Sequence, residues 1–148
     1  MLNVTVGPWT LEVDAEATKL VYEQIEQGAA AGCDCDFCYN FGLVRPQAYP
    51  AEARTLLESL GVDLRKECES FYAKKLPSGK HLYGGWFYVV GTIERGDPDS
   101  DEMFELVPGF QVRVAEADED GTDRFGTRCV QVDFLTEVPW LSDRPEPE

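Results

Sequence analysis

Three cysteines lie within six residues of one another and form the densest group of potential metal ligands in the chain. Cys33, Cys35 and Cys38 follow the pattern C-x-C-x2-C. Residues two apart on an extended chain share a face, and a C-x2-C turn brings a third sulfur back toward them. Because thiolates are preferred ligands of zinc, this spacing predicts a metal site.

Negative charge is crowded at this segment, since Asp34 and Asp36 alternate with the cysteines. Three thiolates beside two carboxylates repel one another strongly unless a divalent cation neutralises them. We therefore expect a bound zinc ion. Two alternatives stay open: reduced thiols with only a packing role, and thiol or disulfide chemistry.

The pair Cys35-x2-Cys38 also has the spacing of dithiol oxidoreductases. Such enzymes need a thiol whose pKa is lowered by a helix N-terminus or by nearby cations. Here the flanking aspartates are expected to raise the thiol pKa. The sequence therefore favours metal binding over redox catalysis.

A tetrahedral zinc site needs a fourth ligand from elsewhere in the chain. His81, the only histidine, is the preferred candidate because it lies where a polar loop becomes a predicted strand. Cys129, at the start of another predicted strand, is an alternative. Cys68 is a weaker one, because its apolar neighbours favour a buried thiol that packs as a small hydrophobe. The predicted metal ligands are Cys33, Cys35, Cys38 and His81.

Helices in the first half of the chain are expected to hold this cysteine loop. The first covers residues 14–27 with Asp14 as its N-cap, and the second covers residues 50–60 between Pro50 and Gly61. A third is predicted over residues 63–75, and the cysteines lie in a loop that leads into a short helical turn. The expected buried face of the first helix consists of Ala17, Leu20, Val21 and Ile25.

Strand patterns dominate the second half. Residues 81–93 are apolar without alternation, which predicts a central strand, whereas residues 110–114 and 130–134 alternate between apolar and polar side chains. Short strands at 4–6 and 10–13 precede the helices. The acidic loops 94–102 and 115–126 each predict a hairpin connection in an antiparallel meander. The expected fold is α+β: N-terminal helices packed on a mainly antiparallel sheet, with residues 1–141 as one domain and 142–148 as a disordered acidic tail.

Composition narrows the partners. The chain has 148 residues, 43% of them hydrophobic, and a formal net charge of −15. This charge repels nucleic acids and anionic lipid surfaces and attracts basic proteins, so we expect a basic protein partner, no nucleic acid and no membrane. The N-terminal residues do not have the pattern of a secretory signal, and five cysteines are an odd number, which together predict a reducing, cytoplasmic environment.

Three segments of the sequence resemble the landmarks of a family of small bacterial proteins. They are the cysteine segment through Asn40 and Phe41, the segment His81-Leu-Tyr-Gly-Gly-Trp86, and the segment from Val132 to Trp140. The family has no established activity, cofactor or partner. The resemblance implies a single domain in the bacterial cytoplasm and lends no catalytic residue.

The function predicted from the sequence is a non-enzymatic protein-interaction domain with a structural zinc ion at the cysteine loop. The alternative is a thiol-dependent or metal-dependent enzyme that uses Cys33, Cys35 and Cys38. In that case the aromatic strand from Tyr83 to Tyr88 would line its pocket.

Overall fold

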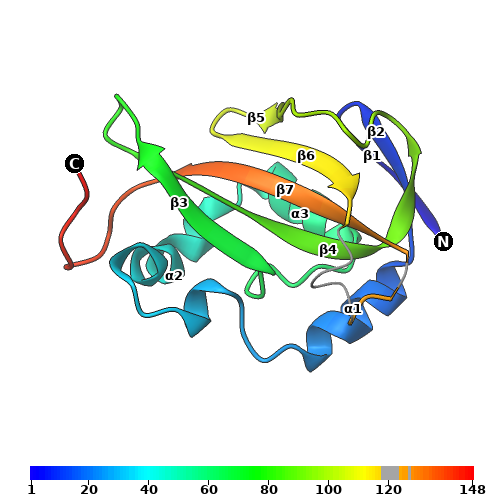
Figure 1. The fold of residues 1–148 in the computed structure, drawn as a ribbon, viewed down its shortest axis with the longest axis horizontal. Helices are drawn as coiled ribbons and strands as arrows, with labels where there is room; N and C mark the ends of the chain where they lie inside the picture. The colour runs from blue at the N-terminus through cyan, green and yellow to red at the C-terminus, as the bar shows by residue number, and fades with distance from the viewer. Residues whose placement is uncertain (118–123, 127) are drawn as a thin grey trace.

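Strand β4 (His81–Arg95) is the longest strand of the structure and organises the sheet around it. The computed structural model describes residues 1–117, 124–126 and 128–148. Within these residues, the strands form one seven-stranded, antiparallel sheet in the order β1-β2-β4-β7-β6-β5, with β3 also paired to β4 (Figure 1). The other strands are β1 (Leu2–Val6), β2 (Trp9–Val13), β3 (Glu69–Lys75), β5 (Phe104–Val107), β6 (Phe110–Glu116) and β7 (Cys129–Val138).

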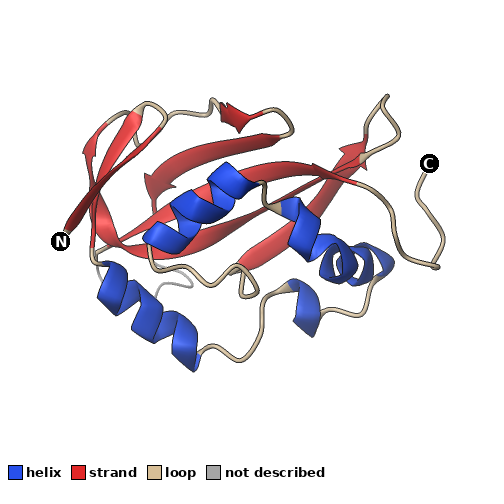
Figure 2. Cartoon of the chain, turned by 180° about the vertical axis from the view of Figure 1, so that it is seen from behind, coloured by secondary structure: helices blue, strands red, loops and turns tan. Residues whose placement is uncertain are grey.

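Helices lie on one side of this sheet (Figure 2). They are α1 (Ala15–Gln24), α2 (Asp36–Ala48) and α3 (Ala51–Ser59), together with the short 3₁₀ turn η1 (Ala30–Gly32). The predicted α+β class is therefore confirmed. None of the helices in the described residues is long and apolar enough to span a lipid bilayer.

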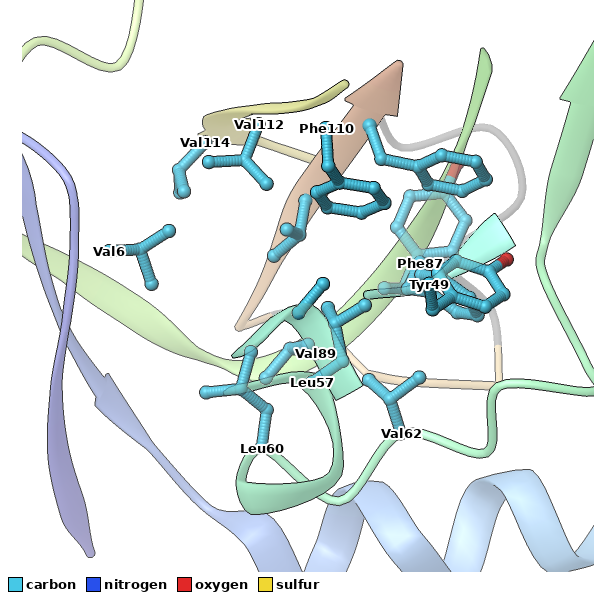
Figure 3. Close-up of a cluster of buried hydrophobic side chains, with 14 of the residues drawn as sticks. Val6, Tyr49, Leu57, Leu60, Val62, Phe87, Val89, Phe110, Val112 and Val114 are labelled. Atoms are coloured by element: carbon cyan, nitrogen blue, oxygen red, sulfur yellow. The ribbon is translucent and has the colours of Figure 1, made fainter. Parts of the chain in front are cut away.

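The core fills the space between the sheet and α3 (Figure 3). Leu57 and Leu60 from the helix region and Phe87 from β4 are almost fully buried. The Phe87 ring stacks on Phe134 of β7 with 5.7 Å between the ring centroids. Apolar side chains on alternate positions of β6 and β7 thus face the helices, as their alternating patterns predict, and β4 contributes Phe87 to the same core.

Helix α1 occupies a gap along the edge of β4. Strands β3 and β2 pair with the two ends of this edge and leave residues 87–90 between them. Thr18 Oγ1 accepts a hydrogen bond from Val90 N at 3.0 Å, Asp14 N donates to Val90 O at 2.9 Å, and the Tyr22 hydroxyl donates to Tyr88 O at 2.8 Å. The helix therefore completes the backbone hydrogen bonding that a strand would otherwise supply.

These contacts correct the predicted buried face of the first helix. Asp14 is its N-cap, as predicted, and accepts a hydrogen bond from Ala17 N. Val21 and Ile25 are partly buried against the core, as predicted, but the fully buried residues are Thr18 and Tyr22, and Leu20 is 58% exposed. Hydrogen bonds to the β4 edge require polar side chains on the buried face of α1, and a search for hydrophobic periodicity does not detect such a face.

The helix predicted over residues 63–75 is wrong. Asp63 caps only a turn, accepting a hydrogen bond from Arg65 N, and residues 69–75 form β3. Phe71 lies on the open face of the sheet above Gly84, whereas Tyr72 points to the helix side opposite Tyr83. Pairing with β4 thus overrides a local apolar spacing that is typical of a helix.

The hairpin predicted for residues 94–102 is also wrong, because β4 pairs with β7 and the chain crosses to β5 at the far edge of the sheet. The strands on either side of the second acidic loop, β6 and β7, do pair with each other. Residues 118–123 and 127 of that loop lie outside the described residues.

Candidate metal centre

The cysteine segment folds at the start of helix α2. Cys33 follows the turn η1, Cys35 is the N-cap of α2, and Cys38 lies in the first turn. The Sγ of Cys35 accepts a hydrogen bond from Cys38 N at 3.4 Å and lies 3.3 Å from the Sγ of Cys33. The Cys35 side chain, as the N-cap, therefore fixes the spacing of the two later cysteines. Helix α2 is longer than the short helical turn expected there, although it contains Gly42 and Pro46.

All three sulfurs lie within 4.8 Å of one another. Tetrahedral zinc with Zn–S bonds of about 2.3 Å separates its sulfur ligands by about 3.8 Å. The arrangement therefore has the dimensions of a metal site. Cys33 and Cys35 are exposed and Cys38 is half-buried, so the group lies at the surface.

The thiols of the group are electrostatically linked. Hydrogen bonding to the Cys35 backbone, and then to the Cys38 and Cys35 side chains, lowers the pKa of Cys33. Burial raises the pKa of Cys38, and its hydrogen bonds to Cys33 and Cys35 raise it further. The charge of Asp34 raises the pKa of Cys33, as expected, but the hydrogen bonds outweigh it, so the net shift of this pKa is downward. The N-terminus of α2 adds a partial positive charge at these sulfurs.

Arg144 partly neutralises the flanking aspartates. Its guanidinium donates to Asp34 O at 3.0 Å and lies 3.4 Å from the Asp34 carboxylate and 3.6 Å from that of Asp36. It also stacks over Tyr39, 4.0 Å from the ring centroid. Arg144 belongs to the tail that the sequence predicts to be disordered. In the structure this tail lies against the cysteine segment.

Asn40 holds the start of the tail through hydrogen bonds to its backbone. It is fully buried, and its Oδ1 accepts hydrogen bonds from Leu141 N at 2.8 Å and Ser142 N at 3.1 Å. Its Nδ2 donates to Pro139 O at 3.2 Å. One amide two residues after Cys38 therefore holds the chain about 100 residues later, a role that sequence spacing cannot reveal.

A buried ion pair holds the other side of the cysteine segment. Arg45 of α2 donates to Glu67 Oε1 at 2.5 Å, and Glu67 accepts from Ala30 N at 3.2 Å. Ala29 N donates to the Glu67 carbonyl at 3.0 Å. Burial raises the pKa of Glu67, and Arg45 opposes this shift. A Cβ at Gly28 would lie 2.2 Å from Glu67 Oε2, so glycine is required for this close approach.

His81, the predicted fourth ligand, is fully buried and hydrogen-bonded through both ring nitrogens. Its Nδ1 lies 2.9 Å from the Tyr72 hydroxyl and its Nε2 lies 2.8 Å from Glu146 Oε1. Among the described residues, the group of ligand atoms within 4.8 Å of one another consists of the three cysteine sulfurs and does not include His81. The fourth ligand thus stays a prediction.

The two other candidate ligands, Cys68 and Cys129, do not belong to the group either. The Sγ of Cys68 lies 3.5 Å from the Tyr22 hydroxyl. Burial is the main cause that raises the pKa of both thiols, and the charge of Cys68 raises that of Cys129 further. These are the properties of partly buried, protonated thiols.

Comparison with protein-family models, with curated proteins and with solved structures finds no match for this chain. The chemistry therefore follows from geometry alone: three surface thiols at a helix N-terminus can coordinate a thiophilic metal ion and leave one tetrahedral position for a further donor.

Proposed function

We propose that the protein is a metal-binding protein in which Cys33, Cys35 and Cys38 hold one zinc ion. The observation that supports this most strongly is the approach of the three sulfurs to within 4.8 Å of one another. Zinc suits the site because it is thiophilic, tolerates three thiolates and a lighter fourth ligand, and needs no redox change.

The metal has a structural role in this proposal. The cysteine segment is largely exposed and has little apolar burial of its own. Three metal–sulfur bonds would tie the end of η1 to the first turn of α2. Because such bonds exist only in the folded chain, their free energy stabilises the fold.

We assign the fourth coordination position to an external donor. His81 would have to exchange its hydrogen bond to Tyr72 or Glu146 before it could bind a metal. Replacing His81 with Gln should therefore leave the metal content unchanged, whereas it would lower the content if this ring completed the site.

The protein would act as an interaction domain in the reducing cytoplasm, where surface thiols stay available for a metal. The net charge of −15 favours a basic protein partner. Exposed apolar side chains on and beside α2 offer contact area next to the cysteines: Phe37, Tyr39, Leu43 and Leu141.

An enzyme is the second candidate, because three protein ligands with a free fourth position are typical of catalytic zinc. The aromatic strand β4 does border a cavity of about 280 Å³, which includes Trp86, Phe71 and Leu135. None of the three clustered cysteines lines this cavity. A pocket formed by the aromatic strand is thus separate from the sulfurs, which favours the non-enzymatic function.

Elemental analysis of the protein purified without chelator tests the proposal. We expect about one zinc per chain, and Cys35→Ser should remove it and lower the thermal unfolding temperature. Cys129→Ser is the matched control and should retain the metal. Equal zinc content in the two variants, or no zinc in the wild type, would overturn the proposal.

A further inference from the structure

A cavity of about 290 Å³ lies between α2, α3 and the segment that follows α3. Three arginines border it, Arg45, Arg54 and Arg65, and its other walls include Pro46, Tyr49 and Leu64. Basic side chains are scarce in this acidic protein, with 13 Lys and Arg against 28 Asp and Glu. Their convergence on one apolar cavity is therefore not expected from composition.

The three arginines differ in how their charge is balanced. Arg45 pairs with Glu67, and Arg65 pairs with Asp63 at 2.9 Å. Arg54 is exposed and makes no ion pair with any residue that the structure describes. The cavity therefore retains one uncompensated positive charge.

Two buried polar atoms of the cavity residues lack a hydrogen-bond partner. They are the Tyr49 hydroxyl and the Nε of Arg45. Tyr49 is only 2% exposed, and its ring is held by Phe87, Phe110 and Phe134 at the margin of the core (Figure 3). Unpartnered buried groups are rare because each costs free energy, so such a pair calls for an explanation.

The chemistry of these groups indicates what they would bind. A guanidinium can only donate hydrogen bonds, and a tyrosine hydroxyl donates readily. The two buried groups without a partner, on Arg45 and Tyr49, thus lack an acceptor, and the exposed guanidinium of Arg54 offers further donors beside them. Carboxylate oxygens are acceptors that match arginine geometry and charge.

We propose that this cavity binds a small organic carboxylate with an apolar body. Its volume corresponds to about ten non-hydrogen atoms, at about 30 Å³ for each water-sized group. The carboxylate contacts Arg54 at the rim, and the apolar body lies against Pro46, Leu64 and the Tyr49 ring. The Tyr49 hydroxyl and the Nε of Arg45 are the further donors that the carboxylate would satisfy. This site is independent of the cysteine group.

Benzoate is a suitable probe, with benzamide as its neutral counterpart of equal shape. In the wild-type protein we expect benzoate to bind with a Kd of about 1 mM or tighter and to shift the NMR signals of Gly42 and Leu64. Benzamide should bind about tenfold more weakly, because it lacks the charge that Arg54 attracts.

Two variants separate binding from folding. Arg54→Gln should weaken benzoate binding about tenfold without a change in the unfolding temperature, whereas Arg95→Gln, the same charge change at the exposed end of β4, should not alter binding. Tyr49→Phe should weaken binding about threefold or more, yet leave stability unchanged or raised, because it removes an unpartnered hydroxyl. Equal binding of benzoate and benzamide, unchanged binding in Arg54→Gln and Tyr49→Phe, or no benzoate binding at all would each overturn the proposal.

Discussion

Asn40 shows how one side chain connects two distant parts of the chain. It is buried without exposed surface, and its amide serves the backbone of residues 139–142. Because these backbone groups are otherwise unpaired, their hydrogen bonds depend on a single residue. Asn40 is two residues from Cys38, so the same first turns of α2 hold both the tail and one of the proposed metal ligands.

Replacing Asn40 with Ala should destabilise the protein by about 2–4 kcal/mol, because the variant leaves two backbone donors without an acceptor and opens a cavity. Denaturant-induced unfolding measures this free energy. The control is Asn3→Ala, at the only other asparagine, which is exposed on the edge strand β1. This variant should change the free energy of unfolding by less than about 0.5 kcal/mol. Similar values for the two variants would argue against a structural role for Asn40.

Glu146 links the tail to His81 in a pH-dependent manner. The hydrogen bond with His81, and then the charge of Lys75, lower the pKa of the Glu146 carboxyl from its ordinary value of 4.5. A carboxyl whose folded-state pKa is lowered stabilises the fold fully above its unfolded-state pKa. It loses this contribution as the pH falls through the folded-state value.

The contact between the tail and the β3–β4 hairpin should therefore weaken once the pH falls below about 4.5 and be lost as it falls through the lowered pKa of Glu146. Glu146→Gln imitates the protonated carboxyl at every pH, so its tail should already be more mobile at pH 6. NMR signals of residues 140–146, followed from pH 6 to pH 3, would report this difference. Tail signals that are identical in the two proteins at pH 6 would contradict the claim that the Glu146 carboxylate holds the tail at His81.

At the scale of elements, patterns that depend on neighbours along the chain were predictive. The strands with alternating burial, the central strand β4 and the helix α3 behind Pro50 were all predicted from the sequence. Patterns that depend on partners in space were not. Residues 69–75 form a strand because β4 offers a free edge, and α2 continues through Gly42 and Pro46 despite their low helix propensity.

The packing of α1 against the β4 edge is the element-scale feature least visible in the sequence. Thr18 Oγ1 donates to Asp14 O at 2.8 Å while it accepts from Val90 N. Thr18→Val keeps the shape and removes both bonds, so the free energy of unfolding should fall by about 1–3 kcal/mol. Thr5→Val on the exposed part of β1 is the control, and chemical denaturation of both variants gives the comparison. A loss no larger than in the control would show that α1 does not complete the strand edge.

In the candidate site too, the sequence predicts what neighbours along the chain determine and does not predict what partners in space determine. The sequence alone identified the three cysteines, because C-x-C-x2-C is a local spacing that α2 and its N-cap convert directly into proximity. It could not identify Glu67, which lies 22 residues from Arg45, or Arg144, which lies 110 residues from Asp34. These partners carry no sequence motif, and only the folded chain brings them together.

At the scale of the whole molecule, the acidic protein carries two distinct regions on one helix, α2. The net charge of −15 surrounds a cysteine group at one end of α2 and an arginine-bordered cavity near its other end. One helix thus carries residues of two separate sites of opposite chemistry. The helices cover only one face of the sheet, so both sites lie on that side of the molecule (Figure 2).

The central claim, that the three sulfurs bind one metal ion, is tested most directly by X-ray absorption at the zinc edge of the zinc-loaded protein. The structure predicts three sulfur ligands at about 2.3 Å and one nitrogen or oxygen ligand at about 2.0 Å. A first shell made only of nitrogen and oxygen atoms would contradict the account, as would a protein that binds no zinc.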